Sequence, residues 1–394
     1  MNHRIEENYD VVICGSGPAG LIAGLHLASA NKNLKIALLD KRDPWREPVA
    51  CAEAVHKGGL YSLLDVDESW IRTEVDGVVF VSPDGTKVKY TQKNSGLIID
   101  RAKMHRSLAE RCAEAGVHVH FRSLVKSISE FTNGKRNLSV KQGEEMLNIQ
   151  AKFVIDSSGA GSRLVPDSGV VDGKFDIEPA VFGLMEGWDY DPRYIELYFG
   201  QNFAPGGYGW VFPRDEDVAN VGICVGRPYV KTHAPRRMFD IFCDKFNPGA
   251  PKPNLHGGPI ACGQTREPHG VNQLFKAGDC TNGVNPISRA GILEAMNGGR
   301  NAAEAILQLL ENPAKAEEAQ IYADVLNKWM SYKGKSHEKL AKAKWPFAEI
   351  PDKTFNKAAL KLSKLPEDKL TLPRILWATL TSSPSILWKM RTIL

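Results

Sequence analysis

Apolar residues near the start of the chain form two short runs on either side of a helical pattern. The Val- and Ile-rich run at 9–14 predicts a buried strand, and residues 21–30 have apolar positions at helical spacing. A second run at 34–39 predicts another strand, which is followed directly by Asp40. The order strand, glycine turn, helix, strand, acidic residue predicts a β–α–β unit.

The pattern changes to a period of two between residues 180 and 225. Four runs separated by Asp, Pro and Gly predict a meander of β-strands: VFGLMEG, YIELYFG, YGWVFP and VANVGICV. Tyr208, Trp210 and Phe212 are spaced two apart, so their side chains share one face. That aromatic face either lines an apolar channel or is simply core.

Three further segments have a readable pattern. Residues 153–157 predict a strand followed by a Gly/Ser turn with Asp156, Gly159 and Arg163, and residues 274–277 predict a strand that ends in Gly278-Asp279. A helix is expected to start at Arg101 and end at Gly116, and another spans 289–310. Towards the C-terminus, residues 333–344 and 353–369 also have a helical pattern.

Composition sets the class of protein. The 394 residues are 43% hydrophobic and 24% charged, an ordinary globular mixture that allows two or three domains. The net charge is only +4, which disfavours a nucleic-acid binder. Residues 331–394 hold 13 Lys/Arg against 5 Asp/Glu, a net of +8, so the rest of the chain carries −4.

The cysteines and the hydropathy pattern predict a location. Seven cysteines without any CxxC pair disfavour a disulfide scaffold, a zinc site or an iron–sulfur cluster, so we expect reduced thiols and no metal. The polar N-terminus predicts no signal peptide, and no run of ~20 predominantly apolar residues predicts a membrane span. A cytoplasmic protein is expected. Its basic, Trp-containing tail either lies on an anionic membrane surface or packs on the body.

The glycine turn predicts a dinucleotide site. Gly15 permits a tight turn, Gly17 lets the backbone approach a pyrophosphate, and Gly20 lets the helix pack on the strand. The helix N-terminus attracts negative charge, and Asp40 is placed to accept hydrogen bonds from a ribose. The residues assigned to the cofactor from this segment are Gly15, Gly17, Pro18, Ala19, Gly20, Asp40 and Lys41.

A second set of candidate cofactor residues comes from later in the chain. Asp279 at a strand end suits the ribityl hydroxyls of a flavin, and a helix that begins near Gly291 and Ile292 suits its pyrimidine ring. Arg101 and Gly278 complete this set. The placing of these signals after the fingerprint favours FAD over NAD.

Together the segments resemble the FAD-binding organisation of the aromatic-hydroxylase-like flavoproteins, and within them the geranylgeranyl reductase family. Pro48-Val-Ala-Cys51 is similar to the Pro-x-x-Cys-Gly motif of that family. Tyr208-Gly-Trp210-Val-Phe212-Pro213, with Gly222, is similar to its substrate motif, and Gly278-Asp279 with Gly291 is similar to its flavin motif. The resemblance covers roughly residues 9–310.

Four positions depart from the family pattern. Ala52 and Arg289 stand where the family has Gly, Cys224 replaces the last Gly of the substrate motif, and Cys280 takes the place of an Ala. Arg289 would either stabilise an anionic reduced flavin or narrow the site. Cys280 is not expected to carry a covalent flavin.

The resemblance implies an α/β fold: a Rossmann-like FAD-binding domain, an inserted and mostly antiparallel β-sheet domain for the substrate, and a C-terminal helical region. The FAD-binding domain is expected to take 1–75, 95–175 and 262–312, the sheet domain 76–94 and 176–261, and the basic helical region 313–394.

The implied activity is FAD-dependent saturation of C=C bonds in isoprenoid, geranylgeranyl-type chains by hydride transfer. Cys51, Tyr208 and Trp210 are then the catalytic candidates, with Cys51 a proton donor or a positioning thiol. The substrate would contact Tyr208, Trp210, Phe212, Pro213 and Gly222. The electron donor would be NADPH or a ferredoxin-type protein. A flavin monooxygenase or halogenase and a non-catalytic prenyl-binding protein are the alternatives.

Overall fold

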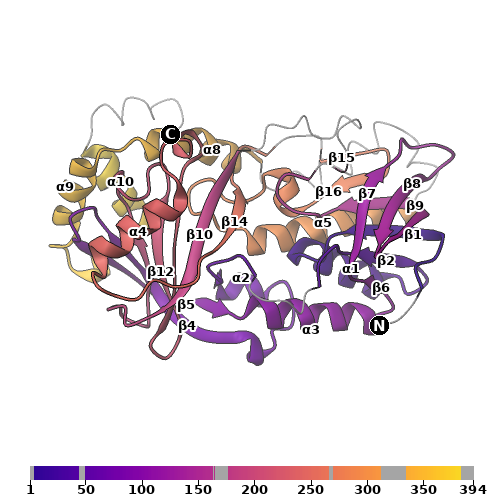
Figure 1. Ribbon diagram of the computed structural model, residues 1–394, viewed down its shortest axis with the longest axis horizontal. Helices are drawn as coiled ribbons and strands as arrows, with labels where there is room; N and C mark the ends of the chain where they lie inside the picture. Colours follow the sequence, from indigo (N-terminus) through magenta and orange to yellow (C-terminus); the bar gives the residue numbers. More distant parts are fainter. Residues whose placement is uncertain are drawn as a thin grey trace. The chain divides into compact units, whose positions relative to one another are not determined.

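The computed structural model describes residues 4–43, 49–162, 164, 176–265, 269–311 and 334–382. The chain divides into two compact units, each assembled from separated stretches. Unit 1 comprises residues 1–47, 102–177 and 261–338, and unit 2 comprises 48–101, 178–260 and 339–394. Two multi-stranded sheets with covering helices confirm the expected α/β class (Figure 1).

Unit 1 contains a sheet of order β15-β16-β9-β1-β2-β6, and β8 joins β9 to β7. Its strands are β1 (Asn8–Cys14), β2 (Ile36–Leu39), β6 (His118–His120), β7 (Ser123–Ile128), β8 (Arg136–Gln142), β9 (Glu145–Asp156), β15 (Gly270–Val271) and β16 (Leu274–Lys276). Strands β6, β2, β1, β9 and β16 run parallel to one another. The Val/Ile run of β1 is fully buried because the strand is central in this sheet.

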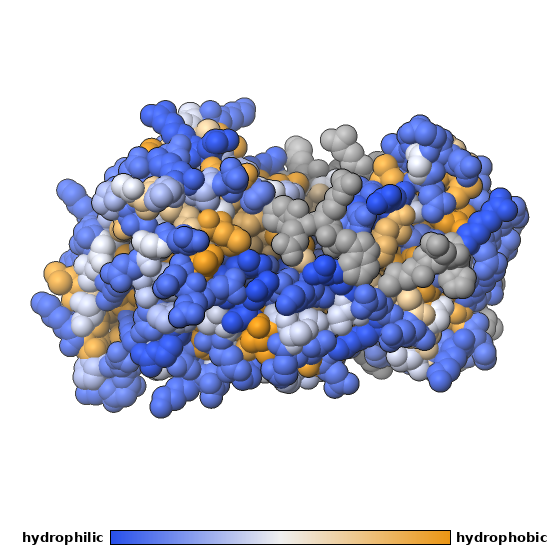
Figure 2. Space-filling model, turned by 60° about the horizontal axis from the view of Figure 1, so that its bottom comes forward, coloured by the Kyte–Doolittle hydropathy of each residue, from blue (hydrophilic) through white to orange (hydrophobic). Residues whose placement is uncertain are grey.

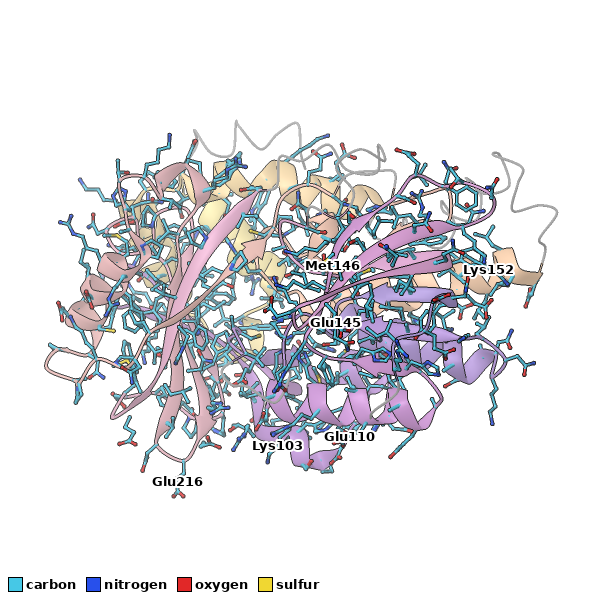
Figure 3. All side chains as sticks on the ribbon, turned by 45° about the vertical axis from the view of Figure 1, so that its right-hand side comes forward. Lys103, Glu110, Glu145, Met146, Lys152 and Glu216 are labelled. Carbon is cyan, nitrogen blue, oxygen red and sulfur yellow. The ribbon has the colours of Figure 1, made fainter. Side chains whose placement is uncertain are left out.

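Among the described residues, three helices belong wholly or mainly to unit 1: α1 (Pro18–Ala30), α3 (Arg101–Glu114) and α5 (Ile292–Glu311), with a short 3-10 turn, η3 (Gly278–Thr281). Helix α3 buries Met104, Leu108 and Cys112 and exposes Lys103 and Glu110, which are labelled in Figure 3. Helix α1 packs against α5 so closely that a Cβ on Gly299 would lie 1.9 Å from the Ala19 carbonyl oxygen. The predicted helix at 101–116 is confirmed, and the helix predicted over 289–310 is present but begins three residues later, at Ile292.

Unit 2 contains the second sheet, of order β14-β10-β13-β12-β11-β4-β5-β3. Its strands are β3 (Ala54–His56), β4 (Ile71–Val81), β5 (Lys87–Ile99), β10 (Ile177–Glu186), β11 (Ile195–Tyr198), β12 (Tyr208–Asp215), β13 (Val218–Cys224) and β14 (His256–Ala261). The four runs predicted between 180 and 225 are strands, but the simple meander is wrong. Strand β10 pairs with β13, and β11 pairs in parallel with β4.

The second sheet also takes in residues that the sequence analysis assigned to the cofactor domain. Strand β3, the first half of β4 and the end of β5 lie in unit 2. The reason is the length of β4 and β5, which pair along almost their whole extent. The predicted domain boundaries came from glycine motifs and charge, which carry no information about the pairing of β4 with β5.

Helices cover unit 2 as well: α2 (Lys57–Tyr61), α4 (Pro235–Phe246), α8 (Gly334–Ala348), α9 (Asp352–Leu362) and α10 (Leu372–Thr381), with 3-10 turns η1 (Glu68–Trp70), η2 (Arg227–Tyr229) and η4 (Glu367–Lys369). On one side of the sheet, Phe239 and Phe242 of α4 pack on Val211, Val221 and Ile223. At the other end of the strands, the turn between β12 and β13 is exposed, and Glu216 points away from the sheet (Figure 3).

The C-terminal helices dock on unit 2. Phe199 stacks on Phe355 of α9 with ring centroids 5.4 Å apart. Gln201 donates its side-chain amide to the Ala348 carbonyl at 2.6 Å. Lys344 of α8 and Glu178 form an ion pair at 2.7 Å, and both side chains are almost wholly buried. These contacts show that the helices over 339–381 are part of the sheet unit.

Candidate functional site

The glycine turn of unit 1 leaves an open approach to the chain's backbone. Gly15 has a φ of +106°, and a Cβ there would lie 2.5 Å from the Ser157 carbonyl oxygen. A Cβ on Gly20 would lie 1.9 Å from the Gly15 oxygen, so both positions require glycine. A Cβ on Gly17 would have nothing within 4 Å. Open space over Gly17, at the start of α1, is the cradle that a pyrophosphate needs.

Four segments leave the same edge of the unit 1 sheet. Cys14 of β1 is in register with Leu39 of β2 and with Asp156 of β9, and Asp156 is in register with Lys276 of β16. Because these strands are parallel, the segments that follow them meet at one edge, where ligands of open α/β sheets bind. The three remote segments predicted to hold the cofactor therefore converge.

Side-chain contacts hold this edge together. The Ser157 hydroxyl donates to the carbonyl oxygens of Cys14 and Gly15, at 3.0 Å in each case. A Cβ on Gly278 would lie 3.1 Å from the Cβ of Ala19, and Gly278 has a φ of +76°. The glycine turn, the segment after β9 and the Gly278-Asp279 turn are thus in contact.

Asp40 is buried at the end of β2, where the fingerprint places it. One of its carboxylate oxygens accepts hydrogen bonds from the Ser16 N–H at 2.7 Å and the Ser16 hydroxyl at 2.8 Å. The other accepts from the Arg42 N–H at 2.7 Å. A carboxylate has about four acceptor sites, so Asp40 can orient the glycine turn and still bind a ribose hydroxyl. Lys41, next to it, is exposed.

The loop before α5 contains Arg289, one of the four departures from the family pattern. Arg289 has a φ of 56°, in the left-handed region that favours glycine, which accounts for the Gly expected there. Its guanidinium donates to the Ile287 carbonyl at 2.6 Å. Asn285 accepts from the N–H groups of Ile287 and Ser288 and so closes the same turn.

The residues of unit 1 fit a flavin dinucleotide. Gly291 and Ile292 stand at the start of α5, whose first N–H groups have no partner within the helix. Asn282, which follows Gly278-Asp279, is 3% exposed, and its side-chain oxygen has no hydrogen-bond partner among the described residues. A buried acceptor without a protein partner is what a bound ligand with hydroxyl or N–H groups would satisfy.

Cys280 has a structural role, because its thiol binds backbone oxygens. Its thiol is fully buried and donates to the carbonyl oxygens of Asp156 at 2.9 Å and Ala277 at 3.1 Å. Burial, with the nearby Asp156 charge, raises the pKa of the Cys280 thiol well above its ordinary value. A thiol that stays protonated and points at backbone oxygens is a poor nucleophile.

The aromatic face of unit 2 is assembled as the alternation predicts. Tyr208, Trp210 and Phe212 are all buried on one side of β12, in a cluster with Phe182 and Cys224. Ala52 and Ala54 also pack against this cluster. Pro213, one residue on, is buried in register with Ala219. We call the side formed by Tyr208, Trp210 and Phe212 the aromatic face.

Cys51 is joined to the aromatic face through Asn220, a residue that the sequence analysis missed. The Trp210 indole N–H donates to the Asn220 side-chain oxygen at 2.9 Å, and the Asn220 amide donates to the Cys51 carbonyl at 2.9 Å. Asn220 is 1% exposed. A polar residue at an apolar strand position of VANVGICV is the signal that would have identified it.

Gly222 makes room for Trp210. A Cβ at position 222 would lie 2.2 Å from Cζ2 of the Trp210 ring and 2.6 Å from the Val181 oxygen. The family-like glycine therefore shapes the aromatic face by its missing side chain.

Gly222→Ala is expected to displace the Trp210 ring and to lower the free energy of unfolding by about 1–3 kcal/mol through overpacking. Urea unfolding and tryptophan fluorescence measure both effects. Gly24→Ala is the matched control, because a Cβ there would make only ordinary contacts of 3.5 Å or more. An unchanged emission spectrum together with unchanged stability in Gly222→Ala would contradict this role.

Some predicted residues have other surroundings. Arg101 lies in unit 2 at the start of α3, and its backbone N–H donates to the Glu53 carboxylate at 3.3 Å. Its contact with a cofactor stays a prediction. Pro48 and Arg163 lie outside the described residues.

Two family models match the chain. One, described as the geranylgeranyl reductase catalytic domain, matches residues 176–255, and one described as lycopene cyclase protein matches residues 10–173. A digeranylgeranylglycerophospholipid reductase of Methanosarcina acetivorans is 30% identical over 402 residues, which cover 99% of this chain and 97% of that protein. The protein of the same name in Methanosarcina mazei is 30% identical over 404 residues, covering 99% and 97%.

Solved structures agree with the fold. A geranylgeranyl bacteriochlorophyll reductase-like protein of Thermoplasma acidophilum superposes with a TM-score of 0.87 at 26% identity, covering 98% of this chain and all of that one. A flavin-dependent halogenase superposes with a TM-score of 0.70 at 18% identity, covering 97% of this chain and 71% of that one. The halogenase likeness extends to the fold alone.

Proposed function

The chain belongs to the digeranylgeranylglycerophospholipid reductase family, and we propose on that premise that unit 1 holds FAD and that unit 2 holds a geranylgeranyl lipid. The protein is an FAD-dependent oxidoreductase that reduces C=C bonds of geranylgeranyl chains. The observation that supports the proposed division of labour is the open cradle at Gly17, next to the contact between Ala19 and Gly278.

When bound, FAD supplies the hydride chemistry that the reduction requires. The chain's own residues hold it: the glycine turn and the start of α1 face the pyrophosphate, Asp40 accepts from a ribose hydroxyl, and Asp279 accepts from the ribityl chain. The first N–H groups of α5, after Gly291, stabilise negative charge that develops on reduction.

The aromatic face binds the prenyl chain in this proposal. Tyr208, Trp210 and Phe212 form an apolar cluster with little exposed surface, the kind of surroundings that a prenyl chain requires. An isolated alkene accepts hydride poorly, and close alignment in a dry site lowers that barrier. Cys51 donates the proton to the second alkene carbon, since it is the one residue of the seven cysteines that is not buried.

Product mass separates this function from its alternatives. Anaerobic incubation of the reduced holoprotein with a digeranylgeranyl glycerophospholipid is expected to raise the lipid mass in two-hydrogen increments. A monooxygenase or halogenase would give no product without oxygen, and a non-catalytic prenyl-binding protein would return the lipid unchanged. Either of those results would refute the proposal.

We propose in addition that electrons reach the cofactor from NADPH or from a ferredoxin-type protein. Anaerobic bleaching of the oxidised flavin spectrum by each donor in turn decides between them. The faster donor at equal concentration is the better candidate, and bleaching by neither would exclude both.

We also propose that α9 and α10 contact an anionic membrane surface. None of the described helices is long and apolar enough to cross a bilayer. The forward face in Figure 2 is largely hydrophilic with scattered hydrophobic residues.

Leu360, Leu372 and Trp377 are hydrophobic side chains of α9 and α10 that are exposed by 54%, 48% and 58%. Five exposed basic residues surround them in sequence: Lys357, Lys361, Lys364, Lys369 and Arg374. Exposed Trp and Leu among basic residues suit the interface of an anionic bilayer.

Replacing both Leu372 and Trp377 by Ser is expected to weaken binding to phosphatidylglycerol vesicles by about tenfold or more, because two interfacial side chains are removed. Vesicle co-sedimentation measures the binding. Met146→Ser is the matched control, since Met146 is exposed by 56% but belongs to unit 1. Equal sedimentation of the double variant and the parent protein would contradict this contact.

A further inference from the structure

The loop that carries Cys51 is held in an unusual conformation. Glu53 has a backbone φ of 70°, in the left-handed region that residues other than Gly and Asn rarely adopt. In this conformation the Glu53 backbone N–H donates to Cys51 Sγ at 3.2 Å. The orientation of the thiol therefore depends on the conformation of Glu53.

The Glu53 carboxylate keeps that conformation in place. It is 6% exposed and accepts from Arg214 Nε at 2.7 Å and from the Arg101 backbone N–H at 3.3 Å. Arg214 lies on β12, the strand that carries the aromatic face. The ion pair thus ties the Cys51 loop to that strand. Burial raises the pKa of the Glu53 carboxyl, and the Arg214 charge offsets part of the rise.

Asn220 ties the same loop from its other side. Its amide donates to the Cys51 carbonyl at 2.9 Å and its oxygen accepts from Trp210. The Cys51 carbonyl is thus bound to β13 and the Cys51 sulfur to the Glu53 N–H. Each polar group in the chain of contacts from Trp210 to Cys51 has a partner, as a rigid buried network requires.

We infer that Glu53 and Asn220 are positioning residues that hold the Cys51 thiol in one orientation at the aromatic face. The inference rests on the proposed function for its catalytic consequence, the delivery of a proton from Cys51. The side chains of Glu53 and Asn220 act on the thiol through the backbone of the loop: Asn220 binds the Cys51 carbonyl, and the Glu53 carboxylate is tied to Arg214 while its own N–H reaches the Cys51 sulfur. A left-handed conformation is unfavourable for a residue such as Glu. Its carboxylate contacts with Arg214 and the Arg101 N–H, and the hydrogen bond from the Ile99 N–H to its carbonyl oxygen, retain it.

Alkylation of Cys51 reports its orientation without flavin or substrate. The other six cysteines are buried, and burial raises the pKa of the Cys112 and Cys243 thiols to about 12. Iodoacetamide on the folded protein should therefore label Cys51 first, and mass spectrometry of the peptide gives the rate.

Glu53→Ala and Asn220→Ala are expected to change the alkylation rate of Cys51 by about threefold or more and to lower kcat by about ten- to a hundredfold, with KM within about twofold. Misplacement of a reacting group by about 1 Å costs on the order of a hundredfold in rate. Glu53→Gln, which retains an acceptor for Arg214, should recover part of kcat. If Glu53→Ala does not fold, Glu53→Gln and Asn220→Ala carry the same test.

Glu196→Gln is the matched control. Glu196 is also a buried glutamate of the second sheet and pairs with Lys87 at 2.8 Å, but it bonds to Tyr198 on the side covered by α4. It should change neither rate.

The inference is overturned if Cys51 is alkylated at the same rate in Glu53→Ala, Asn220→Ala and the parent protein, whatever happens to kcat. A changed alkylation rate with unchanged kcat would overturn it as well. If the parent protein has no reductase activity, the proposed function fails, while alkylation still decides whether Glu53 and Asn220 orient the thiol.

Discussion

Gly17→Ala should lower the affinity for FAD at least about tenfold while the protein stays folded. A tenfold loss corresponds to about 1.4 kcal/mol of binding free energy. A Cβ at position 17 meets no protein atom within 4 Å, so the added methyl group costs the apoprotein little. It occupies the space over the start of α1 that a pyrophosphate requires for close approach. The flavin absorbance of the purified variant and titration of the apoprotein with FAD measure the loss.

Gly24→Ala in the same helix is the control for Gly17→Ala. A Cβ at position 24 would lie 3.5 Å from Cys112 Sγ and from Ile13, so alanine fits, and alanine is the better helix former. Gly24→Ala should keep full flavin content. Parent-like FAD affinity in Gly17→Ala would show that the cofactor does not lie on this turn.

Cys51→Ser should lower the rate of alkene reduction by about a hundredfold or more while leaving flavin content unchanged. A general acid contributes roughly 10²–10⁴ in rate, and a serine hydroxyl is a far weaker acid than a thiol. Cys51 lies in unit 2, whereas the glycine turn that we assign to FAD lies in unit 1, so cofactor binding should not depend on its side chain. Single-turnover reduction of a geranylgeranyl lipid measures the rate.

Cys243→Ala separates the loss of a reactive thiol from the loss of any cysteine. Cys243 is buried in α4, on the side of the sheet opposite the aromatic face. Cys243→Ala should lower the stability of the protein slightly and leave the rate of alkene reduction unchanged. If Cys51→Ser turns over as fast as the parent protein, Cys51 is not the proton donor.

The sequence predicted the part of the fold where the backbone itself makes the site. Gly15 and Gly20 each face a backbone oxygen closer than 2.6 Å from an added Cβ, so no other residue type fits. Such steric demands leave a fixed spacing in the sequence. The same reasoning explains why Tyr208, Trp210 and Phe212 could be placed on one face, because alternation is inherent in a strand.

Other features depend on contacts between residues far apart in sequence. Glu53 meets Arg214 across 161 positions, and neither residue type signals an ion pair by itself. The pairing of β3 with β5 and the docking of Phe355 on Phe199 are equally non-local. Long-range pairings leave no local periodicity, so the extent of the second sheet and the attachment of the C-terminal helices could not be predicted.

We expect one non-covalently bound FAD, held by the converging segments of unit 1, to be the reductant of the alkene. The most direct test is anaerobic mixing of the reduced holoprotein with a geranylgeranyl lipid while the flavin spectrum and the lipid mass are followed together. One flavin should be reoxidised for each double bond lost. Saturation of the lipid by protein stripped of FAD, or reoxidation of the flavin without any gain in lipid mass, would contradict it.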